Sequence, residues 1–290
     1  MRLELLVRRS LLWLPVAFVA ALLLLPLGFM VMVSFWKRAL LRMVPAFDLS
    51  NYIAFVTGTR LAVLGRSFLV SVEATSVCLV IAYPIAYFLV RHARQSVARL
   101  VLLLFTVPFL VNYVIRTFSW TYLLGRTGPI NKGLITIGIV SGPVDWLLYS
   151  DFAVLIGMIS SYMPFMIFPI WVSLSGIDRR LGEASSMLGA RPWTTFRHVT
   201  MPLSMPGVFA AIVFAFVGCF GENAVPIILG GVGYQLIGNE ITSTLDVLNY
   251  PLAAAMSSVV TAAMLALLTL WYVAFDLRSF LGRILSWRIQ

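Results

Sequence analysis

Long apolar runs alternate along the chain with short segments that are polar, basic or rich in Gly and Pro. Each run has about the 20 residues that a helix needs to cross the hydrocarbon layer of a bilayer. The pattern predicts an all-α membrane protein with a single domain over residues 1–290 and six transmembrane helices. The expected spans are residues 11–35, 67–90, 100–124, 152–174, 207–229 and 251–275. The first span follows two arginines, as in a signal peptide, but it exceeds the roughly 7 to 15 apolar residues of such a signal, so we interpret it as a membrane anchor.

The composition agrees with this interpretation. The chain is 61% hydrophobic and 11% charged, with a mean hydropathy of +0.97, whereas a soluble domain has roughly 25% charged residues. The net charge of +10 arises from short basic clusters between the apolar runs, as expected for loops beside an anionic leaflet, so no nucleic-acid partner is expected. Cys78 and Cys219 both lie in apolar runs and predict neither a disulfide nor a thiolate metal site.

The distribution of Lys and Arg predicts the orientation, because cytoplasmic loops retain the positive excess. An arrangement with both termini in the cytoplasm places thirteen of the 21 basic residues inside. The outer loop at 36–66 carries five basic residues and opposes this bias, whereas the outer loop at 230–250 carries none. We therefore predict that both termini are cytoplasmic.

The inner loop at 175–205 has a pattern of its own. Residues 179–188 have helical character, and Gly189 supplies the left-handed conformation that commonly ends a helix. A second short helix is expected to begin at Pro192, since proline is favoured at the first helical position, and to stop before Met201. Two short helices that meet at a glycine bend predict a compact cytoplasmic knob suited to docking.

The same loop carries a set of spaced residues: Glu183, Ala184, Ser185, Gly189, Val199, Met201 and Pro202. The set resembles the signature E-A-A-x3-G-x9-I-x-L-P of bacterial ABC importer permeases. The spacing agrees throughout, and the three departures (Ser for Ala, Val for Ile, Met for Leu) keep a similar size. The resemblance implies that these residues form the coupling helix, which sits in a cleft of the ATPase subunit and transmits its closure to the membrane helices.

The resemblance extends over almost the whole chain from Asn51 onward and is closest to the spermidine/putrescine-type permeases. The passages that carry it include PFLVNYVIRTFSWTYLL, SYMPFMIFPIWVSL and GENAVPIILGG. It implies a type I importer permease fold in the bacterial inner membrane. The implied partners are a second permease, two ATPase subunits that use ATP and Mg, and an extracytoplasmic substrate-binding protein. A polyamine is the expected substrate, with an amino-acid derivative, an organic anion or a ferric complex as alternatives.

The chain contains no phosphate-binding G-x4-G-K-[ST] motif, so ATP is expected to be hydrolysed by other subunits. It also shows no paired catalytic groups and no metal-ligand spacing. We therefore expect no enzymatic activity, no bound cofactor and no metal site in this chain.

Three ionisable residues lie inside predicted spans: Glu73, Arg116 and Glu222. Each costs at least about 2.5 to 3.5 kcal/mol on insertion scales and is therefore a functional candidate. One interpretation is that Arg116 pairs with one of the carboxylates and fixes helix packing. The other is that Glu222 lines the substrate path, because Gly221 and Pro226 interrupt the helix there, and broken helices are tolerated mainly where they pack on protein or line a cavity.

Neighbouring polar and aromatic residues extend the candidate path. Asn223 adds a hydrogen-bonding group, and Tyr113, Trp120 and Tyr162 offer rings for cation–π contact with a protonated amine. The alternative is that these rings only pack the helices.

The mechanism expected from these features is alternating access, in which ATP-driven closure moves the knob and switches the spans between two states. A passive channel, a membrane-embedded enzyme and an exporter permease are the competing interpretations. A channel leaves the inner knob unexplained, and an enzyme would need converging catalytic groups.

Overall fold

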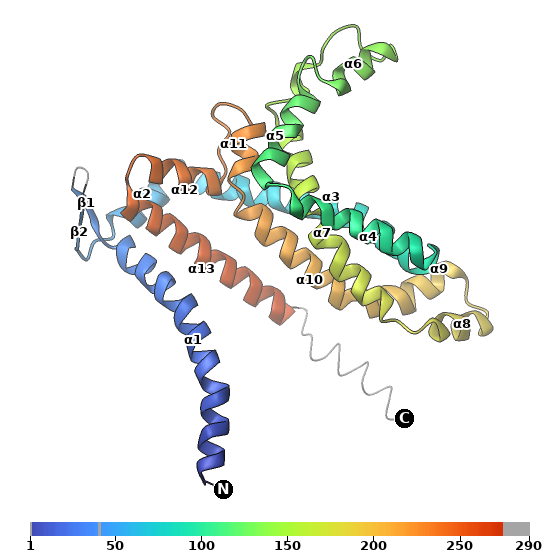
Figure 1. Ribbon diagram of the computed structural model, residues 1–290. Helices are drawn as coiled ribbons and strands as arrows, with labels where there is room; N and C mark the ends of the chain where they lie inside the picture. The colour runs from blue at the N-terminus through green and yellow to red at the C-terminus, as the bar shows by residue number, and fades with distance from the viewer. Residues whose placement is uncertain (1, 40–41, 275–290) are drawn as a thin grey trace. The chain divides into compact units, whose positions relative to one another are not determined.

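The computed structural model describes residues 2–39 and 42–274, which are mainly helical (Figure 1). The helices are α1 (Arg2–Ser34), α2 (Ser50–Thr57), α3 (Arg60–Arg91), α4 (Gln95–Leu110), α5 (Tyr113–Leu124), α6 (Pro129–Thr136), the 3-10 helix η1 (Asp145–Leu147), α7 (Asp151–Ser175), α8 (Arg179–Met187), α9 (Pro192–Thr195), the π-helix η2 (Phe196–Thr200), α10 (Met201–Phe220), α11 (Ala224–Leu229), α12 (Ile237–Asp246) and α13 (Tyr250–Ala274). Two short strands, β1 (Lys37–Ala39) and β2 (Arg42–Val44), pair antiparallel.

Among the described residues, five helices are long and apolar enough to cross a membrane, and a sixth span arises if the bent pair Gln95–Pro108 and Tyr113–Thr136 counts as one span. The all-α membrane fold class is thus confirmed. The predicted third span at 100–124, however, is not one straight helix, because its two halves meet at 96°. Val111 is extended, and the Asn112 side chain accepts hydrogen bonds from the amides of Val114 and Ile115, so a new helix starts there. Residue 275 of the sixth predicted span lies outside the described residues, as do Arg278, Arg283 and Arg288 of the predicted inner charge.

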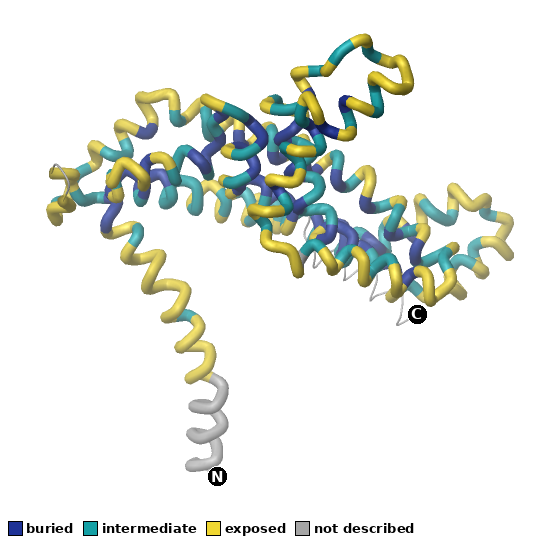
Figure 2. The backbone as a smooth tube through the Cα atoms, turned by 45° about the horizontal axis from the view of Figure 1, so that its top comes forward, coloured by how far each residue is buried: buried dark blue, intermediate teal, exposed yellow. Residues whose placement is uncertain are grey.

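Two compact units make up the chain, and the first comprises Met1–Leu61 and Glu240–Thr269. Its α1 is exposed along most of its described length (Figure 2). α2 begins at Ser50, where the amide and hydroxyl of Ser50 donate to the Asp48 carboxylate at 3.1 and 2.8 Å. These two hydrogen bonds, together with Lys37, hold the pKa of Asp48 below its usual value.

The second unit comprises Ala62–Asn239 and the chain from Leu270 onward, and it contains the candidate site. Its most extensive helix pair is α7 with α10. These helices approach closely because small residues face the partner: a Cβ on Gly207 would overlap the Ser173 side chain. A buried cluster joins α3, α7 and α10, and it includes Ala82, Ala86, Met166, Ile167, Ile170, Ala211 and Ala215.

A second buried cluster lies toward the other end of the same unit. It joins α5, α7 and α11 through residues that include Leu124, Val154, Met158, Val225 and Leu229. Ala74 of α3 and Cys219 of α10 belong to it as well. The two clusters hold the broken helices α4/α5 and α10/α11 against the continuous helix α7.

Candidate functional site

A cavity of about 730 Å³ opens in the second unit where two broken helices meet α7. One wall comes from the bend between α4 and α5, and another from the break between α10 and α11. The polar and aromatic lining includes Asn112, Tyr113, Arg116, Tyr162, Glu222 and Asn223. Five of the seven residues predicted for the substrate path therefore converge on one cavity.

Glu222 occupies the break in the predicted fifth span and is 4% exposed. One carboxylate oxygen, Oε1, accepts hydrogen bonds from the amides of Ala224 and Val225 at 2.9 and 3.2 Å. The other, Oε2, accepts one from the hydroxyl of Tyr162 at 2.7 Å. Glu222 therefore satisfies the free amides that begin α11 and ties this short helix to α7. A carboxylate has about four lone-pair sites, so one acceptor position remains.

Glycines let the helices pack tightly around this break. A Cβ on Gly218 would overlap the ring of Tyr162, and one on Gly238 would overlap the backbone of Glu222. A Cβ on Gly157 would lie 2.6 Å from Leu229 Cδ1, closer than real contacts allow. Larger residues at these positions would displace the Tyr162 ring or α11, so the glycines fix the shape of the cavity wall.

Arg116 lies in the cavity wall without a carboxylate partner. Its Nη1 donates to the Pro108 carbonyl at 2.7 Å, and the guanidinium carbon lies 5.6 Å from the ring centre of Tyr113. Within the described chain, Arg116 forms no ion pair with Glu73 or Glu222, and its buried Nε has no hydrogen-bond partner. The bond to Pro108 spans the bend between α4 and α5, because Pro108 lies in the last turn of α4, where the carbonyl groups have no helical partner.

Two of the predicted path residues lie elsewhere. Trp120 donates its indole N–H to Ser160 at 2.9 Å and packs against the second buried cluster. Glu73 is exposed on α3. Asn112 and Phe165 also line the cavity, although they were not among the predicted path residues. An Asn directly before a helix is the signal that identifies Asn112 as a cap.

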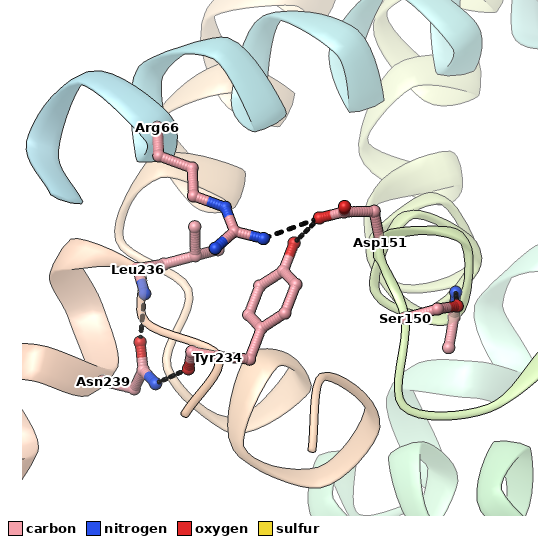
Figure 3. A network of polar contacts seen from close by, with 7 residues as sticks. Arg66, Ser150, Asp151, Tyr234, Leu236 and Asn239 are labelled. Atoms are coloured by element: carbon pink, nitrogen blue, oxygen red, sulfur yellow. Dashed lines mark hydrogen bonds and ion pairs between the residues drawn. The ribbon is translucent and has the colours of Figure 1, made fainter. Parts of the chain in front are cut away.

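A polar network anchors the loop that follows α11 (Figure 3). Arg66 of α3 and the Tyr234 hydroxyl both donate to Asp151 Oδ1, at 2.9 and 2.7 Å, and the guanidinium carbon lies 4.3 Å from the Tyr234 ring centre. Asn239 accepts from the Leu236 amide at 2.6 Å and donates to the Tyr234 carbonyl at 2.7 Å. Burial, followed by the bond to Asp151, raises the pKa of Tyr234 above its usual range, so the phenol stays a donor. The network was not predicted, because its members are far apart in the sequence.

At the other end of the second unit, α8 and α9 form the predicted knob. Asp178 caps α8 by accepting the Arg180 amide at 2.9 Å, and Gly189 adopts the expected left-handed conformation with φ of +80°. The Ser185 and Thr195 hydroxyls bond at 2.9 Å and join the two short helices. Thus the sequence-predicted helix, glycine bend and second helix start at Pro192 are confirmed.

The predicted end of the second helix before Met201 is wrong. Instead, α9 continues through the π-turn η2 into α10, and the Met201 amide bonds to the Phe196 carbonyl. The wider turn suits Pro202, which has no amide hydrogen and would clash with a carbonyl in a regular helix. The second helix of the knob, α9, and the predicted fifth span therefore form one continuous helical segment, Pro192–Phe220.

Apolar side chains on the knob face outward. Met187 and Leu188 are each 88% exposed and Trp193 is 69% exposed, while α8 contains no buried residue. The signature residues Glu183, Ala184 and Ser185 lie in α8, directly before this apolar group. The knob thus presents a compact mixed surface.

Membrane-crossing helices and a broken helix that lines a cavity define a polytopic transport protein. Residues 78–279 match the family described as "Binding-protein-dependent transport system inner membrane component", and the chain belongs to this family. It is a multi-pass inner-membrane permease subunit of an ABC importer, and such a subunit is not itself an ATPase.

Several curated proteins are similar to the chain. The spermidine/putrescine transport system permease protein PotB of Escherichia coli (strain K12) is 34% identical over 227 residues, which cover 78% of this chain and 82% of PotB. PotB of Haemophilus influenzae (strain ATCC 51907 / DSM 11121 / KW20 / Rd) is also 34% identical, with 78% and 79% covered. The inner membrane ABC transporter permease protein YdcU of Escherichia coli (strain K12) is 29% identical, with 74% and 72% covered.

Solved structures agree on the fold. A chain of a bacterial ABC transporter that imports the acidic polysaccharide alginate superposes with a TM-score of 0.72 at 15% identity, covering 96% of this chain and 99% of that one. A bacterial alginate ABC transporter in complex with an alginate pentasaccharide-bound periplasmic protein gives a TM-score of 0.63 at 16% identity, with 92% and 96% covered. At this identity the likeness shows the type I importer permease fold alone.

Proposed function

We propose that this chain forms half of the translocation path of an importer for an aliphatic polyamine of the spermidine or putrescine class. The observation that carries the proposal is the cavity at the two broken helices. The Tyr113 and Tyr162 rings face it together with the buried carboxylate of Glu222 and the amide of Asn223. The two aromatic faces suit contact with an alkylammonium group, and the remaining acceptor position of the Glu222 carboxylate suits a hydrogen bond from it. Similarity to the PotB permeases supports the same substrate class.

The proposed assembly contains this chain, a second permease, two ATPase subunits that bind ATP and Mg, and an extracytoplasmic binding protein, with both termini of this chain cytoplasmic. The alginate transporter solved with its periplasmic protein supports the last partner by family analogy. The exposed apolar residues of the knob suit a cleft in an ATPase subunit. Burying exposed apolar side chains against a partner is energetically favourable.

The continuous segment Pro192–Phe220 supports a direct route for coupling. At 1.5 Å per residue it is about 43 Å long, with the knob at one end and the Gly221–Asn223 break at the other. A movement of the knob driven by ATPase closure is transmitted along this helix to the wall of the cavity. The cavity then changes its access from one side of the membrane to the other.

A second substrate class is favoured by one observation, the unpartnered Nε of the Arg116 guanidinium in the cavity wall. A guanidinium selects a carboxylate rather than an ammonium group. Under this alternative the solute is an amino-acid derivative or another organic anion, and the importer role is unchanged.

The two classes are separated by the ATPase activity of the reconstituted importer with its binding protein. The central pair of solutes is putrescine and 4-aminobutyrate, which share a four-carbon chain and differ in one terminal group. Spermidine, amino acids, sugars and ferric ion complete the panel. Stimulation by putrescine or spermidine supports the polyamine, and stimulation by 4-aminobutyrate alone supports the anion-binding alternative. Stimulation only by a sugar or by ferric ion contradicts both substrate classes.

A further inference from the structure

Glu73 presents a carboxyl group on an exposed face of α3, inside the predicted span 67–90 and six residues from its first residue. At 1.5 Å per residue it lies about 20 Å along the helix axis from Arg60 and about 27 Å from Arg91. Within residues 2–39 and 42–274, Glu73 takes part in no hydrogen bond or ion pair. The chain therefore places an unpartnered acidic group at the depth of the hydrocarbon layer.

The surrounding face of α3 supplies no partner for this group. Leu69, Val72 and Val80 are exposed beside Glu73 along the helix, at 68%, 40% and 72%. Ser76 is the polar neighbour one turn away, but its hydroxyl donates to the Val72 carbonyl of its own helix at 2.7 Å. Lipid tails cannot donate a hydrogen bond either, so an intramembrane carboxyl group of this kind is expected to face protein or water.

Glu73 lies at a similar level in the second unit to the helix break beside Glu222. Its neighbour Ala74 belongs to the same buried cluster as Cys219, which lies three residues before Glu222. The carboxyl group of Glu73 thus stands near the level of the broken helix but outside the lining of the cavity.

We infer that this face of α3 is an interface with the second permease subunit, and that a transmembrane helix of that subunit presents a basic side chain to Glu73. The inference rests on the proposed function, which supplies the second permease. A charged partner fits best because an acidic group in a low-dielectric layer is stabilised most by an opposite charge with hydrogen-bond contact.

A second copy of this chain fits the face less well. Near the middle of its described spans, this chain offers Arg116 as a cation, and that guanidinium is held by the Pro108 carbonyl inside its own cavity wall. Nearer the span ends, Arg66 is paired with Asp151 and Arg60 with Glu240. A different chain is therefore the better source of the basic group.

Photo-crosslinking in the assembled importer tests the contact. A benzophenone amino acid replaces Leu69, which is 68% exposed one turn before Glu73 on α3, so that Glu73 itself stays in place. The variant is expressed with its second permease and both ATPase subunits, and the same replacement at Leu103 of α4, which is 65% exposed, serves as the comparison site. We expect position 69 to crosslink to one transmembrane helix of the second permease. Crosslinking only to lipid, to a second copy or within the same chain overturns the inference.

The direction in which the amount of co-purified second permease changes gives an independent readout. Glu73→Leu is expected to lower the amount of second permease that co-purifies with this chain by about tenfold or more, because a buried basic group loses its partner. Glu73→Gln, which keeps an acceptor, is expected to lower it less. If Glu73 faces lipid, Glu73→Leu leaves co-purification unchanged or increases it, and the inference is wrong.

The outcomes also separate this inference from the proposed function. Normal assembly and solute uptake without a crosslink at position 69 would overturn the interface and leave the importer role intact. Failure of the wild-type chain to co-purify with a second permease at all would contradict both.

Discussion

At the scale of single residues, Glu222 shows how a charged side chain can be required by the fold and by the solute path together. The sequence identified it through its cost in the membrane. The structure adds that its two oxygens already accept two backbone amides and the Tyr162 hydroxyl. The negative charge therefore holds the cavity wall in place and also contributes to the potential inside the cavity.

Replacing Glu222 separates these two contributions. Glu222→Ala leaves three donors without this acceptor, and the buried amide of Val225 alone costs about 1 to 3 kcal/mol. Thermal unfolding of the purified importer, followed by the loss of monodisperse complex, is expected at a clearly lower temperature. Glu222→Gln keeps one carbonyl oxygen for the amides of α11 and removes the charge, so it is expected to unfold nearer the wild type while losing stimulation by polyamine. Equal unfolding temperatures for Glu222→Ala and the wild type would contradict the capping role.

The Tyr234 hydroxyl offers a second test at this scale. Tyr234→Phe removes one donor to Asp151 but keeps the ring beside Arg66. We expect a loss of about 0.5 to 1.5 kcal/mol in stability and faster proteolysis in the loop between α11 and α12. Tyr122→Phe is the matched control, because that ring is 72% exposed on α5. A loop that is cut no faster in Tyr234→Phe than in Tyr122→Phe would show that the network does not anchor it.

At the scale of helices, the packing of α7 against α10 and α11 sets the size of the cavity. Gly218→Ala places a methyl group into the Tyr162 ring, and overpacking of this kind typically costs about 1 to 3 kcal/mol. The Tyr162 ring, which lines the cavity, must then shift, so we expect both a lower unfolding temperature and reduced uptake.

Gly65→Ala is the control for Gly218→Ala, since a Cβ at Gly65 of α3 meets no atom within 4 Å. It is expected to behave as the wild type or to be slightly more stable, because alanine favours the helix. Uptake assays on vesicles with matched protein levels compare the two variants. Wild-type uptake by Gly218→Ala would contradict the packing argument.

The helices differ in how far the sequence alone predicts them. Spans with long apolar runs, such as α7 and α13, were found within one residue at each described end, because bilayer thickness imposes their length. Apolar residues continue through the bend at Val111 and Asn112, so hydropathy does not mark where one helix ends and the next begins. The π-turn at Phe196–Thr200 was missed, since Pro202 signals a helix end as readily as a wider turn.

The sequence predicted only part of the candidate site, because local patterns do not show which distant residues meet. Charge and helix-breaking residues identified Glu222 locally, but its bond to Tyr162 joins residues 60 positions apart in the sequence. The convergence of Arg116 and Tyr113 on the same cavity depends on the bend between α4 and α5. Such long-range placement follows from packing, which hydropathy does not encode.

At the scale of the whole chain, one helical segment joins the knob to the cavity. The knob bends at Gly189, and its second helix begins the segment Pro192–Phe220, which extends to the break beside Glu222. We infer from this arrangement that the fixed geometry of the Gly189 bend transmits ATPase closure to the cavity.

The most direct test is the number of solute molecules taken up per ATP hydrolysed in proteoliposomes containing the complete importer. Gly189 has φ of +80°, which strains a β-branched residue by about 1 to 3 kcal/mol, whereas asparagine tolerates this conformation. We predict that Gly189→Val keeps membrane insertion and ATPase activity but lowers the ratio by about tenfold, and that Gly189→Asn keeps the wild-type ratio. A wild-type ratio in well-expressed Gly189→Val would contradict the account.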